Sequence, residues 1–118
     1  MLRLGSSATP FRASTRDALL RAEQLLVTPV ARAEIAIKLS IGKLYLPVDE
    51  SIYWKSLVSR LQAVELPFTS SHAALLATMP LLHRDPFDRM IIAQGLIEGL
   101  HIATTDAMFG QYGVRIIT

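Results

Sequence analysis

The stretch HRDPFDRMIIAQGLIEGL, residues 83–100, decides the fold. It opens with two carboxylates among basic and titratable groups and then becomes almost wholly apolar. Asp85 before Pro86 is typical of a helix N-cap with proline in the first turn. Gly99 stands where helices commonly end. The stretch therefore predicts a buried helix over 86–98, in which Asp88 lies in the first turn and favours the helix dipole.

Short apolar runs alternate with helical patterns along the rest of the chain. The apolar runs LLVT, VELP, LHIAT and VRIIT predict strands at 25–28, 64–67, 100–104 and 114–118, and MLRL at 1–4 is a further strand candidate. Helices are expected at 15–24, from Pro29 to near Gly42, at 49–63, at 70–79 after Thr69 as N-cap, and briefly at 106–112. This alternation predicts βαβ crossovers and a parallel sheet, and hence an α/β fold.

Size and composition exclude several classes of protein. The chain has 118 residues, of which 51% are apolar and 19% charged, so we expect one globular domain spanning 1–118. It has no cysteine, which excludes disulfide scaffolds, thiolate zinc sites and cysteine nucleophiles and fits a reducing, cytoplasmic compartment. No apolar run approaches the roughly 20 residues of a membrane span, and the N-terminus has no apolar core of a secretory signal.

Three acids fall at or just after the carboxyl ends of expected strands: Glu34, Asp88 and Asp106. Ligands of parallel α/β sheets bind at these ends. Clustered carboxylates provide the oxygen ligands that Mg²⁺ or Mn²⁺ prefers, and their mutual repulsion is relieved by a cation. Together the acids predict a metal site that acts on phosphoryl groups.

Each acid also has a simpler explanation. Glu34 either compensates the helix dipole in a first turn or pairs with Lys38 four residues later. Asp85 is explained as the N-cap, and Asp106 as the N-cap of the short helix after it. The net charge of +2 is too small to indicate nucleic-acid binding by itself. The chain has no HxxxH zinc spacing, no phosphate-binding glycine loop and no GxSxG motif.

Three segments resemble a known family: EIAIKLSIGKLYLP (34–47), HRDPFDRMIIAQGLIEGL (83–100) and ATTDAMFGQYGV (103–114). They resemble PIN-domain ribonucleases, specifically the VapC-type toxins of bacterial type II toxin–antitoxin systems, and they follow the family's order and spacing over about residues 14–118. The resemblance implies a three-layer α/β/α sandwich around a parallel central sheet. It also implies Mg²⁺- or Mn²⁺-dependent RNA hydrolysis by a metal-activated water, leaving a 5′-phosphate and a 3′-hydroxyl.

The resemblance also assigns roles to residues and partners. It makes Glu34, Asp88 and Asp106 the metal ligands and catalytic acids, and Thr104 the residue that orients them or the water. Further candidates are Asp85, as a secondary site residue, and three basic residues that contact phosphate or RNA: Arg84, Arg89 and Lys38. The implied partners are an RNA substrate, a VapB-type antitoxin and a second copy of the chain in a homodimer.

The N-terminal segment departs from the family pattern. Family members begin with a strand of the type LLLDTHALLW, whose aspartate is a principal metal ligand, whereas MLRL here leads into GSSATPF and the first acid is Asp17. We therefore expect residues 1–13 to be atypical: either Ser6 or Ser7 replaces the aspartate, or the first strand is truncated or rearranged. Because Mg²⁺ sites rely on few carboxylates, nuclease activity is expected to be weak or lost.

Two alternatives to a ribonuclease follow. The first is a catalytically impaired interaction module that binds an antitoxin or itself through the helix faces of 52–61 and 14–24. The second is another Mg²⁺-dependent phosphoryl-transfer enzyme, which ranks last because the chain lacks an early strand-terminal acid or phosphate loop.

Overall fold

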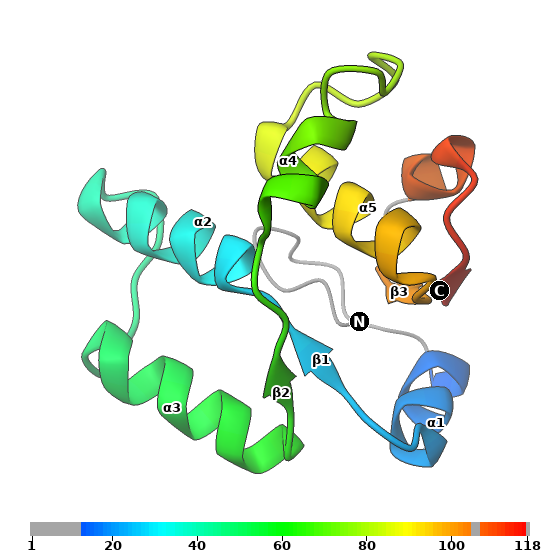
Figure 1. Ribbon diagram of the computed structural model, residues 1–118. Helices are drawn as coiled ribbons and strands as arrows, with labels where there is room; N and C mark the ends of the chain where they lie inside the picture. The colour runs from blue at the N-terminus through cyan, green and yellow to red at the C-terminus, as the bar shows by residue number, and fades with distance from the viewer. Residues whose placement is uncertain (1–12, 105–106, 118) are drawn as a thin grey trace.

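The computed structural model describes residues 13–104 and 107–117, where helices alternate with parallel strands (Figure 1). In chain order the elements are α1 (Ala13–Arg21), β1 (Leu26–Val27), α2 (Pro29–Ser40), α3 (Glu50–Leu61), β2 (Val64–Glu65), α4 (Ser70–Leu75), α5 (Pro86–Glu98), β3 (Ile102–Ala103), the 3₁₀ helix η1 (Ala107–Tyr112) and β4 (Ile116–Ile117). This order confirms the predicted α/β class.

The strands form two parallel pairs. Leu26 of β1 lies opposite Val64 of β2, and Ile102 of β3 lies opposite Ile116 of β4. The strands are shorter than the apolar runs that predicted them, although the β1–β2 ladder continues as the Leu66 amide donates to the Val27 carbonyl at 2.8 Å. Each pair requires a crossover through helices, which explains the parallel direction. The strand candidate at 1–4 lies outside the described residues.

Local capping chemistry sets the helix boundaries. Asp85 caps α5, its Oδ1 accepting hydrogen bonds from the amides of Phe87 at 2.9 Å and Asp88 at 3.1 Å, and Gly99 ends the helix with φ +65°. The predicted boundaries of this helix are confirmed. At the start of α2, Thr28 is the N-cap, and its hydroxyl accepts from the amide of Val30 at 3.1 Å.

Three helices are shorter than predicted, and one of them is α3, which covers Glu50–Leu61 and not 49–63. α1 covers Ala13–Arg21 and not 15–24. α4 covers Ser70–Leu75 and not 70–79. The hydroxyl of Thr78 donates to the Leu75 carbonyl at 3.2 Å, and such local side-chain bonding competes with helix continuation.

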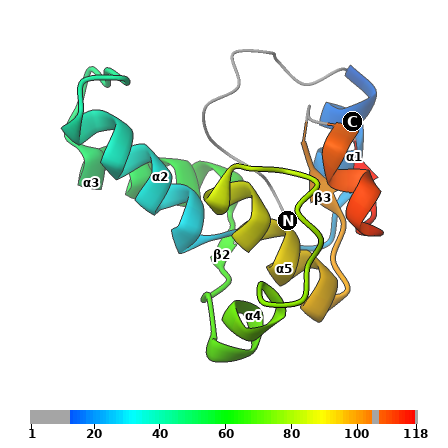
Figure 2. The ribbon, with the colours of Figure 1, turned by 90° about the horizontal axis from the view of Figure 1, so that it is seen from above.

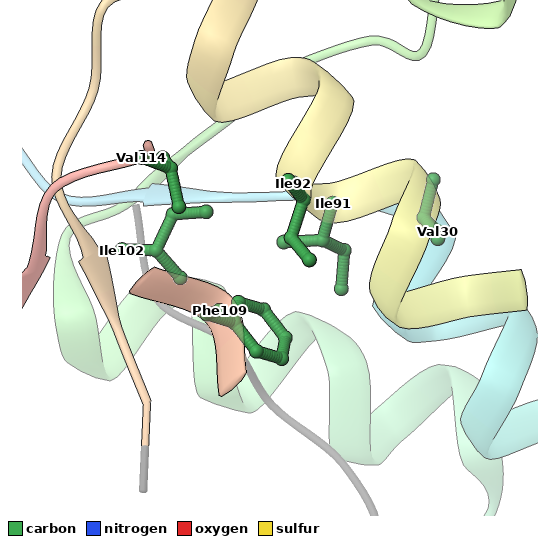
Figure 3. Packing of buried hydrophobic residues seen from close by; sticks show 6 residues of the cluster. All are labelled: Val30, Ile91, Ile92, Ile102, Phe109 and Val114. Carbon is green, nitrogen blue, oxygen red and sulfur yellow. The ribbon is translucent and has the colours of Figure 1, made fainter. Parts of the chain in front are cut away.

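Two clusters of buried apolar side chains flank α2. One cluster joins α2, α5, β3 and η1 and consists of Val30, Ile91, Ile92, Ile102, Phe109 and Val114 (Figure 3). The other lies between β1, α2 and α3 and consists of Val27, Ala31, Ile35 and Trp54. α2 therefore contributes to both cores, with Val30 in one and Ala31 in the other.

The apolar face of α3 belongs to the second core. Trp54 is 3% exposed, and Leu57, Val58 and Leu61 pack against the same cluster, whereas Ile52 is 58% exposed. The interaction-module alternative assigned the 52–61 face to a partner, but most of this face is used inside the domain. In the part of the chain that the structure describes, none of the helices has the length and apolar character needed to cross a membrane.

Candidate active site

Glu34 is a buried carboxylate on α2. Its side chain is 1% exposed, and its Oε2 accepts a hydrogen bond from Nζ of Lys38 at 2.9 Å. The predicted i,i+4 pair is therefore present. The alternative of dipole compensation in the first turn is wrong, because α2 begins at Pro29 and has no acid in its first turn.

The second carboxylate oxygen of Glu34, Oε1, indicates what the site could bind. Oε1 is buried and, among the residues that the structure describes, has no hydrogen-bond partner. Leaving a buried polar group unsatisfied costs about 1–3 kcal/mol, and more for a charged one. A buried carboxylate oxygen of this kind is suited to a cation ligand.

Asp88 lies in the first turn of α5, where a negative charge interacts favourably with the helix dipole. Its side chain is 4% exposed, and its Oδ2 lies 3.2 Å from Nε2 of His83. Asp88 and Glu34 thus share one arrangement: each is buried, and each has one oxygen next to a basic side chain.

The packing of α2 on α5 relates the two acids. Val30 and Ile92 belong to one core cluster. Glu34 is four residues after Val30, and Asp88 is four residues before Ile92. The two helices run in opposite directions in both views (Figures 1 and 2). One turn toward the C-terminus on α2 and one turn toward the N-terminus on α5 therefore lead in the same direction from the shared core. Glu34 and Asp88 both lie in that direction.

Thr104 follows β3 and is 1% exposed. Its amide donates to the Ile117 carbonyl at 3.1 Å, which continues the β3–β4 ladder. Asp106 lies outside the described residues, so its meeting with Glu34 and Asp88 stays a prediction. Over 13–104 and 107–117, no three His, Cys, Asp or Glu side chains gather closely enough to hold a metal ion.

The three basic candidates differ in their surroundings. Arg84 is exposed. Arg89 donates to the Met79 carbonyl at 3.2 Å and supports the segment before α5, while Lys38 binds Glu34. Asp85, the secondary candidate, is the N-cap of α5.

His83 contacts Asp88 of the candidate site, although the sequence motif did not predict this contact. Its Nδ1 accepts from the Asp85 amide at 3.2 Å, and its ring meets that of Phe109 edge-on, with centroids 5.9 Å apart. Its own amide donates to the Tyr112 hydroxyl at 2.8 Å. The sequence signal for these contacts is the place of His83 two residues before Asp85, the N-cap of α5.

A second group of charged residues lies on α2, α3 and β2 and forms structural contacts. Arg32 pairs with Glu50 at 2.6 and 3.1 Å, which lowers the pKa of the Glu50 carboxyl and raises the pKa of the Arg32 guanidinium. Glu65 accepts from the indole of Trp54 at 2.6 Å, and Arg32 lies over the same ring. These acids therefore have structural partners.

The chain is similar to one known protein family. The family model for the PIN domain matches residues 3–114. No curated protein and no solved structure gives a match. The matched span includes all the described acids and both core clusters.

Proposed function

Because this chain belongs to the PIN domain family, we propose that it is a divalent-metal-dependent endoribonuclease. PIN domains are typically metal-dependent nucleases, and the three segments around Glu34, Asp88 and Asp106 resemble the ribonuclease branch. The observation that carries the proposal is the buried Oε1 of Glu34, which has no hydrogen-bond partner within 13–104 and 107–117. A carboxylate in this state costs folding free energy unless a ligand compensates it.

The proposed ligands of the cation are Glu34, Asp88 and Asp106. Their oxygen atoms match the preference of Mg²⁺ and Mn²⁺ for hard ligands. A bound ion of this class supplies Lewis acidity toward the phosphodiester and lowers the pKa of water.

The other side chains of the site position these acids. Lys38 holds one oxygen of Glu34, which leaves Oε1 for the ion. Asp85 fixes the first turn of α5 and with it the backbone of Asp88. The proposed role of Thr104 is to orient the acids or the water, and that of the exposed Arg84 is to contact an RNA phosphate. Arg89 is a weaker candidate for such contact because it already binds the Met79 carbonyl.

The finer proposal is a VapC-type toxin that is cytoplasmic, homodimeric and held inactive by a VapB-type antitoxin. Its support is the resemblance of the three segments. Co-expression with the product of a small adjacent gene tests it: we expect a stable complex whose formation suppresses RNA cleavage. Independent migration of the two proteins, with cleavage unaffected, contradicts it.

A second candidate is a catalytically impaired PIN domain that acts as an interaction module. It is favoured by the N-terminal sequence, in which the first acid is Asp17. Asp17 is exposed and lies within α1, away from the start of any helix that follows a strand. The proposed replacements, Ser6 and Ser7, lie outside the described residues.

RNA cleavage separates the two candidates. Purified protein is incubated with labelled single-stranded RNA and Mn²⁺, beside Glu34→Gln, Asp88→Asn and Asp106→Asn, with the exposed Asp17→Asn as matched control. A ribonuclease loses cleavage in the three site variants and keeps it in the control. Cleavage unchanged in all variants removes the site assignment, and Mn²⁺ binding without cleavage favours the impaired module.

A further inference from the structure

The loop before α5 brings a histidine to one of the proposed metal ligands. Nε2 of His83 lies 3.2 Å from Oδ2 of Asp88. The His83 side chain is 15% exposed and that of Asp88 is 4% exposed. Attraction between polar groups in such a shielded place is stronger than between the same groups at the surface.

The second ring nitrogen of His83 fixes its tautomer. Nδ1 accepts from the Asp85 amide at 3.2 Å, so this nitrogen carries no proton and the ring proton of neutral imidazole is on Nε2. The Nε2–H group then lies beside Oδ2 of Asp88, at a separation of 3.2 Å that a hydrogen bond can span. The same Asp85 caps α5 with its side chain. Its amide therefore links His83 to the start of the helix that carries Asp88.

Packing holds the imidazole in this orientation. The ring lies edge-on to Phe109 at an interplanar angle of 89°, and Phe109 is fully buried. The Tyr112 hydroxyl accepts from the amides of both Leu82 and His83 at 2.9 and 2.8 Å. The loop is thus attached to η1, the element that follows Asp106 in the chain.

We propose that His83 is a positioning residue that orients the Asp88 carboxylate toward a divalent cation. This inference rests on the proposed function. Groups that hydrogen-bond to metal ligands fix the ligand's orientation, and removing them typically reduces metal affinity about 10- to 100-fold. One oxygen of Asp88 is directed by His83, as one oxygen of Glu34 is directed by Lys38.

Three substitutions at His83 distinguish the effect of its N–H donor from the effect of its ring shape. His83→Gln places an amide N–H near the position of Nε2 and preserves donation to Asp88. His83→Asn reaches only the position of Nδ1, so it keeps an acceptor for the Asp85 amide and loses the donor. His83→Phe keeps the ring beside Phe109 and also loses the donor.

The measurement is Mn²⁺ binding to the full chain, followed by the electron paramagnetic resonance signal of free Mn²⁺. Asp88→Asn is the reference for loss of a ligand, and the thermal midpoint without metal reports folding. We expect His83→Asn and His83→Phe to weaken Mn²⁺ binding about 10-fold or more, and His83→Gln to stay close to the unsubstituted protein.

Two results overturn the inference alone: unchanged Mn²⁺ affinity in His83→Asn and His83→Phe, or an equal loss in His83→Gln. If one donor-deficient variant does not fold, the other decides, because one retains the acceptor and the other the ring. Failure of the proposed function looks different. In that case the unsubstituted protein does not bind Mn²⁺, or Asp88→Asn binds it as well as the unsubstituted protein does, and the inference is overturned with it.

Discussion

Replacing Glu34 by methionine should make the metal-free protein more stable and abolish its response to metal. Glu34→Met keeps the length of the side chain and removes the buried oxygen for which the described part of the chain offers no hydrogen-bond partner. Relief of an unsatisfied buried polar group contributes about 1–3 kcal/mol. The opposing loss is the pair with Lys38, whose side chain is 25% exposed and can turn to solvent.

The net magnitude follows from these two terms. Removing one partner of an ion pair costs about 3–5 kcal/mol where the remaining charge stays buried, and less where that charge can reach water. Since Lys38 is only partly buried, we expect a gain near 1 kcal/mol. For a domain of this size that raises the thermal midpoint by roughly 4 °C. Glu23→Met, at an exposed position between α1 and β1, is the control and should change stability by less than about 0.5 kcal/mol.

Thermal unfolding followed by circular dichroism, with and without Mn²⁺, is the assay. At an Mn²⁺ concentration 100 times its dissociation constant, the unsubstituted protein should gain about 2.7 kcal/mol, and the Glu34→Met variant should gain nothing. A lower midpoint in the metal-free Glu34→Met variant would refute the argument, because it would show that the carboxylate stabilises the fold. A retained response to Mn²⁺ would show that Glu34 is not a ligand.

Three further predictions concern the framework of the site. Asp85→Ala removes the acceptor for two amides at the start of α5 and should cost about 1 kcal/mol in urea unfolding; an unchanged midpoint contradicts the capping role. Ile92→Ala opens a cavity at a fully buried core position and should cost about 2–5 kcal/mol by the same measurement, and a smaller loss means that the core collapses around it. Glu50→Gln should destabilise by about 0.2–1 kcal/mol at neutral pH. The lowered pKa of Glu50 means that this difference is present above its unfolded pKa, near 4.3, and fades as the pH falls through the lower folded value; a difference that persists in acid contradicts the ion-pair explanation.

Elements with strong local signals could be read from the sequence. α5 was predicted with its correct bounds because Asp85, Pro86 and Gly99 act within a few residues of the backbone that they cap. The strands were located but predicted too long, since an apolar run does not reveal how many of its residues find a partner across the ladder. The apolar pattern of α3 likewise did not reveal that its face packs on α2.

Part of the candidate site could be predicted from the sequence. The i,i+4 spacing predicted the contact of Glu34 with Lys38, which is local. The contacts of His83 were not predictable, because they include Phe109 and Tyr112, more than twenty residues away in sequence. The surroundings of Oε1 of Glu34, which lacks a hydrogen-bond partner among the described residues, likewise depend on burial by the folded chain.

The most direct test is a crystal structure of the protein soaked in Mn²⁺, with the ion located from its anomalous scattering. Convergence of the acids predicts one peak bound by Oε1 of Glu34 and by a carboxylate oxygen of Asp88, at about 2.0–2.6 Å from each. Asp106 should bind the same ion. Well-ordered Glu34 and Asp88 side chains that point apart, with no shared peak between them, would contradict it.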